Sequence, residues 1–213
     1  MKVREAVERR RSIKKFDPEH ELNDDQMREL FEPLMFIPSS FNLQHWRYVA
    51  VRDKAGKEAL CEASYGQRQV GDCSVVVAVT AKLNAHEDAA QIWRESPPDV
   101  AERMVAIIEK YYGGDERLQR DEVMRSGSLG AMALMLLASA QGLDSCPMIG
   151  FNAKKVHELL EIPDTAVIVM LLCIGKATQP ARPRIGRFST QDVVRLEGFQ
   201  GPGLPSSSVD VPR

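Results

Sequence analysis

The sequence lacks the signals of several common functional classes. Its four cysteines form no Cys-x-x-Cys pair, and its four histidines show no metal-ligand spacing, so we expect reduced thiols and no zinc site. The 28 basic and 30 acidic side chains nearly balance, and the net charge of -2 gives no general reason to expect nucleic acid as a partner. No Gly-x-Gly-x-x-Gly motif is present, and the opening MKVREAVERRR lacks the apolar core of a signal peptide. These absences favour a cytoplasmic protein without a dinucleotide-binding fold.

Apolar runs long enough to cross a membrane are also missing. A membrane span needs about 20 apolar residues, and the longest run here is shorter. Between Ser128 and Ala140 every residue is small or apolar, and Arg125 and Gln141 flank this run. A helix that is apolar all round is buried on all sides, so we expect no membrane span but a central helix or a subunit seam. Gly142 is the expected C-cap.

The segment after Gly142, CPMIGF, is expected to be irregular. Pro147 has no backbone N–H, whereas the N–H groups of Met148, Ile149 and Gly150 remain available. Such amides could contact the edge of a planar heterocycle. A simple connection to the next helix is the alternative on this stretch alone.

Basic residues cluster near the N-terminus, where Arg9, Arg10 and Arg11 end a short predicted helix and an extended Ser-Ile-Lys-Lys-Phe follows. Alternation would place Ser12 and Lys14 on one side of the extended segment. A hydroxyl, an ammonium and guanidinium groups on one side could bind an anion. Solvated surface charge is the alternative.

The remaining pattern predicts an alternation of helices and buried strands in one domain, 1–213. Within it we expect a helical segment over residues 84–125, called the lid segment below, and an extended tail over 199–213, rich in proline and serine. Asn23 is the expected N-cap of a helix that Pro33 kinks or shortens. Further helices are expected over 54–64, 101–112 and from 121 into the central run, and strands over 48–51, 74–80 and 166–174.

Four segments together, RRSIKKF, PSSFNLQHW, GLDSCPMIGF and ARPRIGR, resemble the FMN-dependent nitroreductase family in order and spacing. The resemblance covers nearly the whole chain. It implies an α+β fold, a three-layer sandwich with a mainly antiparallel sheet flanked by helices. It also implies an intertwined homodimer with two FMN sites across the interface.

The resemblance also implies the roles of individual residues. Ile149 departs from the best-known branch, which often has an acidic residue there, but a backbone N–H contact does not need a particular side chain. Gln67 and Gln69 stand roughly where that branch has a second lysine near the pyrimidine edge. The matched positions are Arg10, Arg11, Arg182 and Arg184 for the phosphate and ribityl chain; Ser12 and Lys14 for the polar rim of the ring; Pro38, Ser39, Ser40 and Asn42 for contacts from the partner subunit; and Pro147, Met148, Ile149 and Gly150 for the ring near N5.

The function that the resemblance implies is an oxidoreductase that passes electrons from NADH or NADPH to an electron-poor acceptor, such as a nitroaromatic or a quinone, by a ping-pong mechanism. FMN carries that chemistry, so no catalytic side chain is nominated. Cys146 could be a redox thiol, although small apolar filling is the favoured interpretation. The alternatives are another flavin reaction on the same fold (ene or aldehyde reduction, dehalogenation, flavin breakdown) and a non-catalytic FMN-binding protein.

Overall fold

The structure is a computed structural model of the chain and describes residues 1–205. The chain divides into two compact units, Met1–Ala181 and a second unit that begins at Arg182. The second unit contains the short helix α9 (Thr190–Val193), and the N–H of Leu204 bonds back to the C=O of Val194 at 2.9 Å. The tail prediction for 199–213 falls partly outside the described residues, which end at 205.

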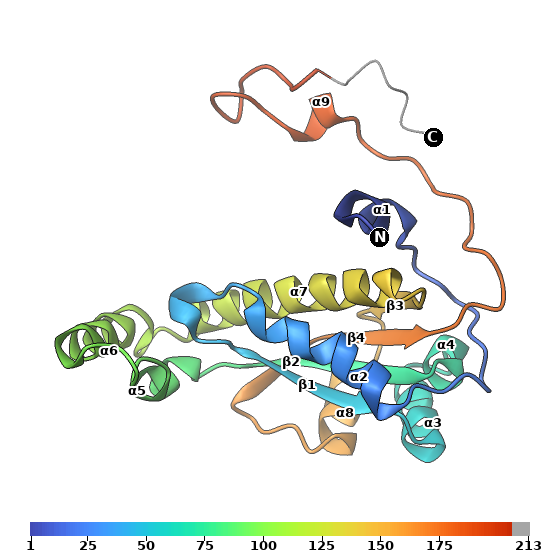
Figure 1. The fold of residues 1–213 in the computed structure, drawn as a ribbon, viewed down its shortest axis with the longest axis horizontal. Coiled ribbons are helices and arrows are strands. Elements are labelled where there is room, and N and C mark those ends of the chain that lie inside the picture. Colours follow the sequence, from blue (N-terminus) through green and yellow to red (C-terminus); the bar gives the residue numbers. More distant parts are fainter. Residues whose placement is uncertain (206–213) are drawn as a thin grey trace. The chain divides into compact units, whose positions relative to one another are not determined.

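The first unit is built on a four-stranded antiparallel sheet in the order β1-β2-β4-β3 (Figure 1). Both faces of β2 are buried, in agreement with its run of β-branched residues. Because β1 and β3 lie at the two edges, each has one side that is not paired with another named strand of the described chain. The strands are β1 (Trp46–Val51), β2 (Val75–Lys82), β3 (Asp144–Met148) and β4 (Ala166–Gly175).

Helices α2 (Asp24–Phe31) and α7 (Glu116–Ala140) cover one face of the sheet. Asn23 caps α2 as predicted: its side chain accepts from the N–H of Gln26, whose own side chain accepts from the N–H of Asn23. The chain then continues as the 3-10 helix η1 (Glu32–Phe36), with Pro33 in its first turn. The predicted effect of Pro33 is therefore confirmed.

Three helices cover the opposite face of the sheet and enclose a second core. They contribute Leu60, Val70 and Val156, which are all buried against the even-numbered residues of β2. Together with α7 and α2 they make the three layers that the resemblance implied. These helices are α3 (Lys54–Ala63), α4 (Arg68–Asp72) and α8 (Ala153–Leu159).

Of the two alternatives for the central stretch, a helix buried on all sides by its own chain is wrong, and the subunit seam stays a prediction. Within one protomer α7 is buried on one side only, and Leu129 and Met132 are 49% and 36% exposed. Small residues such as Gly127 and Gly130 let the other side of α7 pack closely on the sheet. This contact holds the helix without a second layer of the same chain on its exposed side. Among the described residues α7 is also the one helix long and apolar enough to cross a membrane, but half of its apolar window is buried inside the fold.

The segment CPMIGF is the second correction, because Cys146, Pro147 and Met148 belong to β3 and are not irregular. Alternate residues of an edge strand point their N–H groups away from the neighbouring strand. The C=O of Ser145 points outward and accepts from Ile13 at 3.0 Å, so position 147 points outward too. A proline there removes no ladder bond, which is why the strand tolerates it.

The lid segment packs on a small core of its own. Leu43, Ala85, Ala89, Ile108 and Tyr112 form this cluster, and all five are nearly inaccessible. The remaining elements are α1 (Val3–Arg9), η2 (Ser40–Asn42), η3 (Ala85–Asp88), α5 (Ala89–Ile92) and α6 (Pro98–Tyr112).

Candidate functional site

The N-terminal segment is fixed to the free edge of β3. Ser12 forms a parallel bridge with Ser145, and the side chain of Ile13 is buried at 4% exposure, whereas Ser12 and Lys14 are exposed. The predicted alternation is therefore confirmed. It places the hydroxyl of Ser12 and the ammonium of Lys14 on the accessible side, next to the strand that leads to Pro147.

Positive charge gathers at this edge without carboxylates to neutralise it. Among the described residues no carboxylate forms an ion pair with Arg10 or Lys14, and Nη1 of Arg10 is buried without a hydrogen-bond partner. Leaving a buried charged donor unsatisfied is costly. A group that brings an anion to this edge would remove the cost.

The thiol of Cys146 lies beside these cations. Burial raises its pKa, with Lys14 and Arg10 acting in the opposite direction. The thiolate is the reactive form of cysteine, so a raised pKa makes this thiol inert. The structure thus agrees with Cys146 as apolar filling.

Two glutamines on α4 and before it approach the end of β3. Nε2 of Gln67 donates to the C=O of Gly150 at 2.7 Å, and Nε2 of Gln69 donates to Oε1 of Gln67 at 2.9 Å. Within the described chain the N–H groups of Ile149 and Gly150 form no hydrogen bond, and Ile149 is 82% exposed. The structure therefore brings together, in one protomer, a set that we call the cationic edge: Arg10, Ser12, Lys14, Gln67, Gln69, Pro147, Met148, Ile149 and Gly150.

The other predicted contacts lie on a second surface, the loop of residues 38–44 between η1 and β1. Its backbone is unusual, because Phe41, Asn42 and Gln44 have φ angles of 50°, 57° and 48°, in the left-handed region that non-glycine residues seldom adopt. Within the loop the N–H of Gln44 donates to Oγ of Ser39 at 2.9 Å. Pro38, Ser39, Ser40 and Asn42 are all at least partly exposed.

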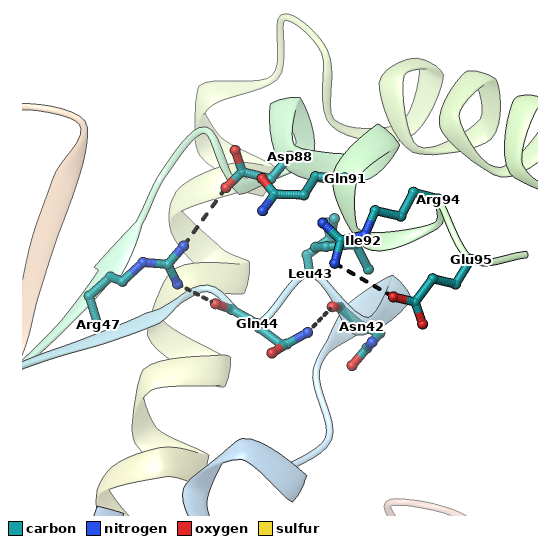
Figure 2. Close-up of a pocket in the computed structure, with 9 residues that line it drawn as sticks. All are labelled: Asn42, Leu43, Gln44, Arg47, Asp88, Gln91, Ile92, Arg94 and Glu95. Carbon is teal, nitrogen blue, oxygen red and sulfur yellow. Dashed lines mark hydrogen bonds and ion pairs between the residues drawn. The ribbon is translucent and has the colours of Figure 1, made fainter. Parts of the chain in front are cut away.

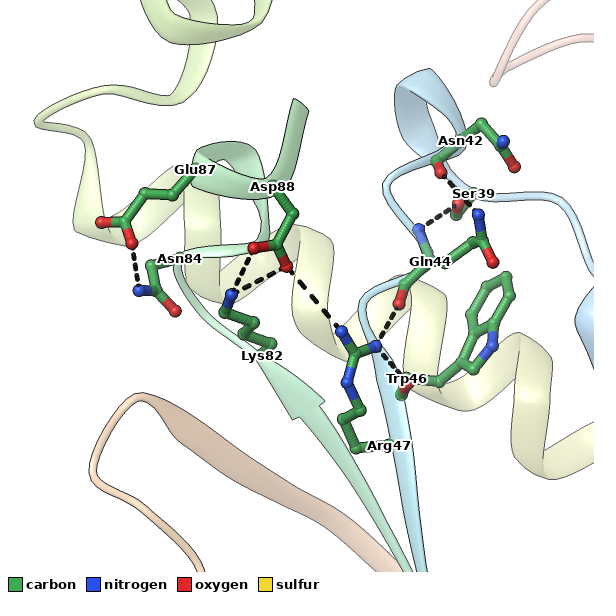
Figure 3. A network of polar contacts seen from close by, with 9 residues as sticks. All are labelled: Ser39, Asn42, Gln44, Trp46, Arg47, Lys82, Asn84, Glu87 and Asp88. Carbon is green, nitrogen blue, oxygen red and sulfur yellow. Dashed lines mark hydrogen bonds and ion pairs between the residues drawn. The ribbon is translucent and has the colours of Figure 1, made fainter. Parts of the chain in front are cut away.

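A polar network supports this loop from the side of the sheet (Figure 3). Nη1 of Arg47 donates to the C=O of Gln44 at 2.7 Å, and Nη2 lies 3.8 Å from the carboxylate of Asp88. Asp88 also receives two bonds of 2.7 Å from Nζ of Lys82. Gln44, Arg47 and Asp88 also line a cavity of about 330 Å³ between the loop and the start of the lid segment (Figure 2).

The loop 38–44 and the cationic edge lie at opposite edges of the sheet. The loop leads into β1 and the cationic edge surrounds the end of β3, so three strand spacings, about 14 Å, separate the two strands. The two predicted groups therefore do not meet in one protomer. Arg11 lies next to Arg10 in the sequence. Arg182 and Arg184 belong to the second unit, and their role in cofactor binding stays a prediction.

Sequence reasoning missed Tyr112, Arg47 and Asp88 as supports of the loop. Tyr112 is noticeable as one of few aromatic residues, but only the fold shows that its hydroxyl reaches Ser40 at 2.7 Å. Arg47 and Asp88 are ordinary charged residues in the sequence. No signal in their surroundings distinguishes them from solvated charges.

A buried polar cluster joins the start of β1 to α7. His45 is 2% exposed, its Nδ1 lies 3.4 Å from Oγ of Ser126, and Ser126 donates to Glu122 at 2.9 Å. Burial lowers the pKa of His45 to about 4, although Glu122 acts in the opposite direction. Arg47, His86 and Arg125 add to the lowering. His45 is therefore neutral in the folded protein near neutral pH.

Comparisons with known proteins match this sequence and this fold. The model of the Nitroreductase family matches residues 7–176. Protein DrgA of Synechocystis sp. is 42% identical over 83% of this chain and 85% of its own, and NADH dehydrogenase of Thermus thermophilus is 35% identical over 84% and 88%. A crystal structure from Exiguobacterium sibiricum, in complex with FMN, superposes with a TM-score of 0.84 at 30% identity, covering 91% of this chain and 96% of that one.

The fold and the match over most of the chain define the class. The chain belongs to the nitroreductase family. The family resemblance read from the four sequence segments is therefore confirmed.

The neutral state of His45 predicts a loss of stability in mild acid. In the unfolded chain His45 binds a proton below about pH 6.5, the usual pKa of histidine. In the folded chain it binds one only near its lowered pKa of about 4. The free energy of unfolding should therefore fall between pH 6.5 and 4, by about 3 kcal/mol at most from this group. Urea unfolding across this pH range should show a steeper fall for the natural chain than for His45→Gln. Parallel curves would show that His45 does not cause the loss.

Proposed function

We propose that this protein is an NAD(P)H-dependent FMN oxidoreductase that reduces electron-poor acceptors of the nitroaromatic or quinone type. The observation that supports this most directly is the cationic edge, where the unpartnered guanidinium nitrogen of Arg10 and the ammonium of Lys14 lie beside two unused backbone N–H groups. An anionic chain together with a ring that accepts hydrogen bonds would use all of these groups. The family membership identifies FMN as a molecule of that description.

In this proposal Arg10 and Arg11 hold the phosphate of FMN, with Arg182 and Arg184 as further cations. Ser12 and Lys14 bind the polar rim of the ring, where the positive charge of Lys14 favours the anionic reduced form. Gln67 and Gln69 orient the segment Pro147–Gly150 through the bond to the C=O of Gly150. The N–H groups of Ile149 and Gly150 are the donors offered to the ring.

Bound FMN supplies the transfer of two electrons from NADH or NADPH to the acceptor. The protein needs no acid or base of its own for this, and its work is to bind, orient and exclude water. Among the described residues no three His, Cys, Asp or Glu side chains come together as a metal site would require.

We further propose a cytoplasmic homodimer in which the loop 38–44 of one protomer meets the cationic edge of the other. The position of these surfaces at opposite edges of the sheet supports this, since one protomer alone does not bring them to one FMN. The exposed apolar side of α7 supports it as well, because Leu129 and Met132 are large side chains left uncovered. A two-fold contact through α7 would bury both.

The test of the function is flavin binding followed by reduction. The purified protein should be yellow, or should become so with added FMN. Its flavin absorption should bleach when NADH or NADPH is added without oxygen, and recover when a quinone or nitroaromatic is added. A protein that cannot be loaded with FMN would refute the proposal, and bound flavin that never bleaches would leave a non-catalytic FMN-binding protein.

The phosphate assignment predicts a specific loss of FMN affinity in Arg10→Ala. Removing one partner of a charged hydrogen bond costs about 1.5–3 kcal/mol, roughly a tenfold to hundredfold rise in Kd. Arg9→Ala is the matched control, because Arg9 is an exposed arginine at the end of the same helix. Fluorescence titration with FMN measures both. Equal affinity for FMN in the two variants would contradict the role of Arg10.

The dimer predicts that Leu129→Asp separates the protomers, because a carboxylate would have to be buried unpaired in the contact. Leu159→Asp is the control: Leu159 is similarly exposed, at 47%, but lies on α8 on the other side of the sheet. Sedimentation should show a monomer for the first variant and a dimer for the second. FMN affinity should fall with the dimer, so a monomeric variant with normal FMN affinity would refute a shared site.

A further inference from the structure

The loop 38–44 adopts a shape that its own sequence does not favour. Phe41, Asn42 and Gln44 all have positive φ angles and none of them is glycine. Residues in sparsely populated backbone regions cost on the order of 1–3 kcal/mol each and persist only when their surroundings hold them. The loop bonds the N–H groups of Asn42, Leu43 and Gln44 within itself, and side chains from outside the loop add to this support.

Tyr112, the last residue of α6, provides such support. Its hydroxyl donates to Oγ of Ser40 at 2.7 Å, and its side chain is only 2% exposed. The rings of Phe41 and Tyr112 meet edge to face with centroids 6.2 Å apart. One residue of the lid segment thus contacts both a predicted FMN contact and the strained residue that follows it.

The position of Tyr112 is itself fixed. Its ring packs in the small core with Leu43 and Ile108, and its C=O accepts from Nε2 of Gln119 at 2.8 Å. Burial raises the pKa of Tyr112, so its phenol stays protonated and keeps a hydrogen to donate. A fixed donor at the end of α6 therefore meets a loop that would otherwise relax.

We propose that Tyr112 is a positioning residue for the FMN site, which acts through Ser40 and couples the lid segment to the loop 38–44. This rests on the proposed function, in which the loop contacts FMN bound to the partner. The cavity of about 330 Å³ is lined on one side by Asn42 and Gln44 and on the other by Gln91 and Arg94 (Figure 2). A molecule that binds against the lid segment there would therefore also act on the loop that contacts FMN.

The first test uses the FMN-free protein, so it does not depend on the activity of the loaded enzyme. The N–H groups of Asn42, Leu43 and Gln44 are bonded within the loop, and hydrogen exchange reports how often those bonds open. In Tyr112→Phe these amides should exchange about fivefold faster, since one neutral hydrogen bond is lost and the ring remains. Unchanged exchange would overturn the proposal.

Tyr111→Phe is the matched control. Tyr111 neighbours Tyr112, and its ring also meets Phe41, with centroids 5.9 Å apart, but its side chain is 53% exposed. Removing its hydroxyl should leave the loop amides as they are in the natural chain. Equal acceleration of exchange in both variants would mean that general loosening of α6, and not the bond to Ser40, controls the loop, and would overturn the proposal.

The second test is a double-mutant cycle on FMN affinity. Tyr112→Phe should raise the Kd of FMN about fivefold, and Ser40→Ala should raise it by at least as much, because it removes the bond to Tyr112 together with the proposed contact of Ser40 with FMN. The double variant should be no weaker than Ser40→Ala alone, because the bond that Tyr112→Phe removes is already lost there. The visible circular dichroism of bound flavin should shift alike in all three. Independent, multiplying effects would overturn the proposal, because Tyr112 would then act by a route other than Ser40.

The outcomes separate this proposal from the function on which it rests. If Arg10→Ala weakens FMN binding and Tyr112→Phe changes neither affinity nor exchange, FMN binding stands and the positioning role of Tyr112 is refuted. A natural chain that cannot be loaded with FMN would refute both.

Discussion

The packing of α7 against the sheet is the constraint on which the rest of the structure depends. A Cβ atom at Gly127 would collide with Val169, and one at Gly130 with the hydroxyl of Tyr48. Side chains larger than glycine at these positions would push the helix away from the sheet. With glycine at both positions the side of α7 that faces the sheet is buried, and the opposite side keeps exposed apolar side chains such as Leu129 and Met132.

The length of α7 also sets the spacing of the candidate site. Its 25 residues span about 37 Å. The lid segment runs into the first half of α7, and the chain leaves the last turn for β3 through Gly142, whose φ is 78°. The loop 38–44 is bound to the lid segment and the cationic edge to β3, so the helix holds the two surfaces apart. A two-fold contact along this helix is the simplest way to bring the loop 38–44 of one copy to the cationic edge of a second copy.

A buried guanidinium nitrogen without a hydrogen-bond partner distinguishes Arg10 from the other cations of the described chain. Arg68 pairs with Glu58 and Asp72, and Arg125 pairs with Glu122. Such pairs satisfy guanidinium groups locally and leave little field for a ligand. Among residues 1–205 no carboxylate pairs with Arg10 in this way, and its Nη1 is buried without a partner. A buried guanidinium nitrogen of this kind is suited to binding an anion.

The sequence predicted the features that depend on residues close together in the chain. The cap at Asn23, the buried β2 and the alternation of Ser12, Ile13 and Lys14 all follow from short-range rules, and the structure has them. It did not predict β3, because a short edge strand that contains Pro147 has no strand-like pattern and exists only through its pairing with β4. Tertiary contacts override local preference in such segments.

The same reasoning explains which part of the candidate site could be found. The residues of the cationic edge come from three short segments, residues 10–14, 67–69 and 147–150, and the family pattern identified them together. The supports of the loop 38–44 were not visible, because Tyr112 and Ser40 are 72 residues apart, and Asp88 meets Arg47 only when β1 and β2 pair. Contacts of this kind depend on the whole fold.

Two anchors from different elements hold the loop 38–44, and both involve the lid segment. Tyr112 binds Ser40 from α6, and Asp88 fixes Arg47, which binds the C=O of Gln44 (Figure 3). If the loop contacts FMN, the orientation of the cofactor depends on the same segment that lines the cavity. Exposed side chains of that segment, such as Arg94, can change to suit another acceptor without moving the loop. Tyr112 and Asp88 cannot change in that way, because the strained backbone between Phe41 and Gln44 relies on them.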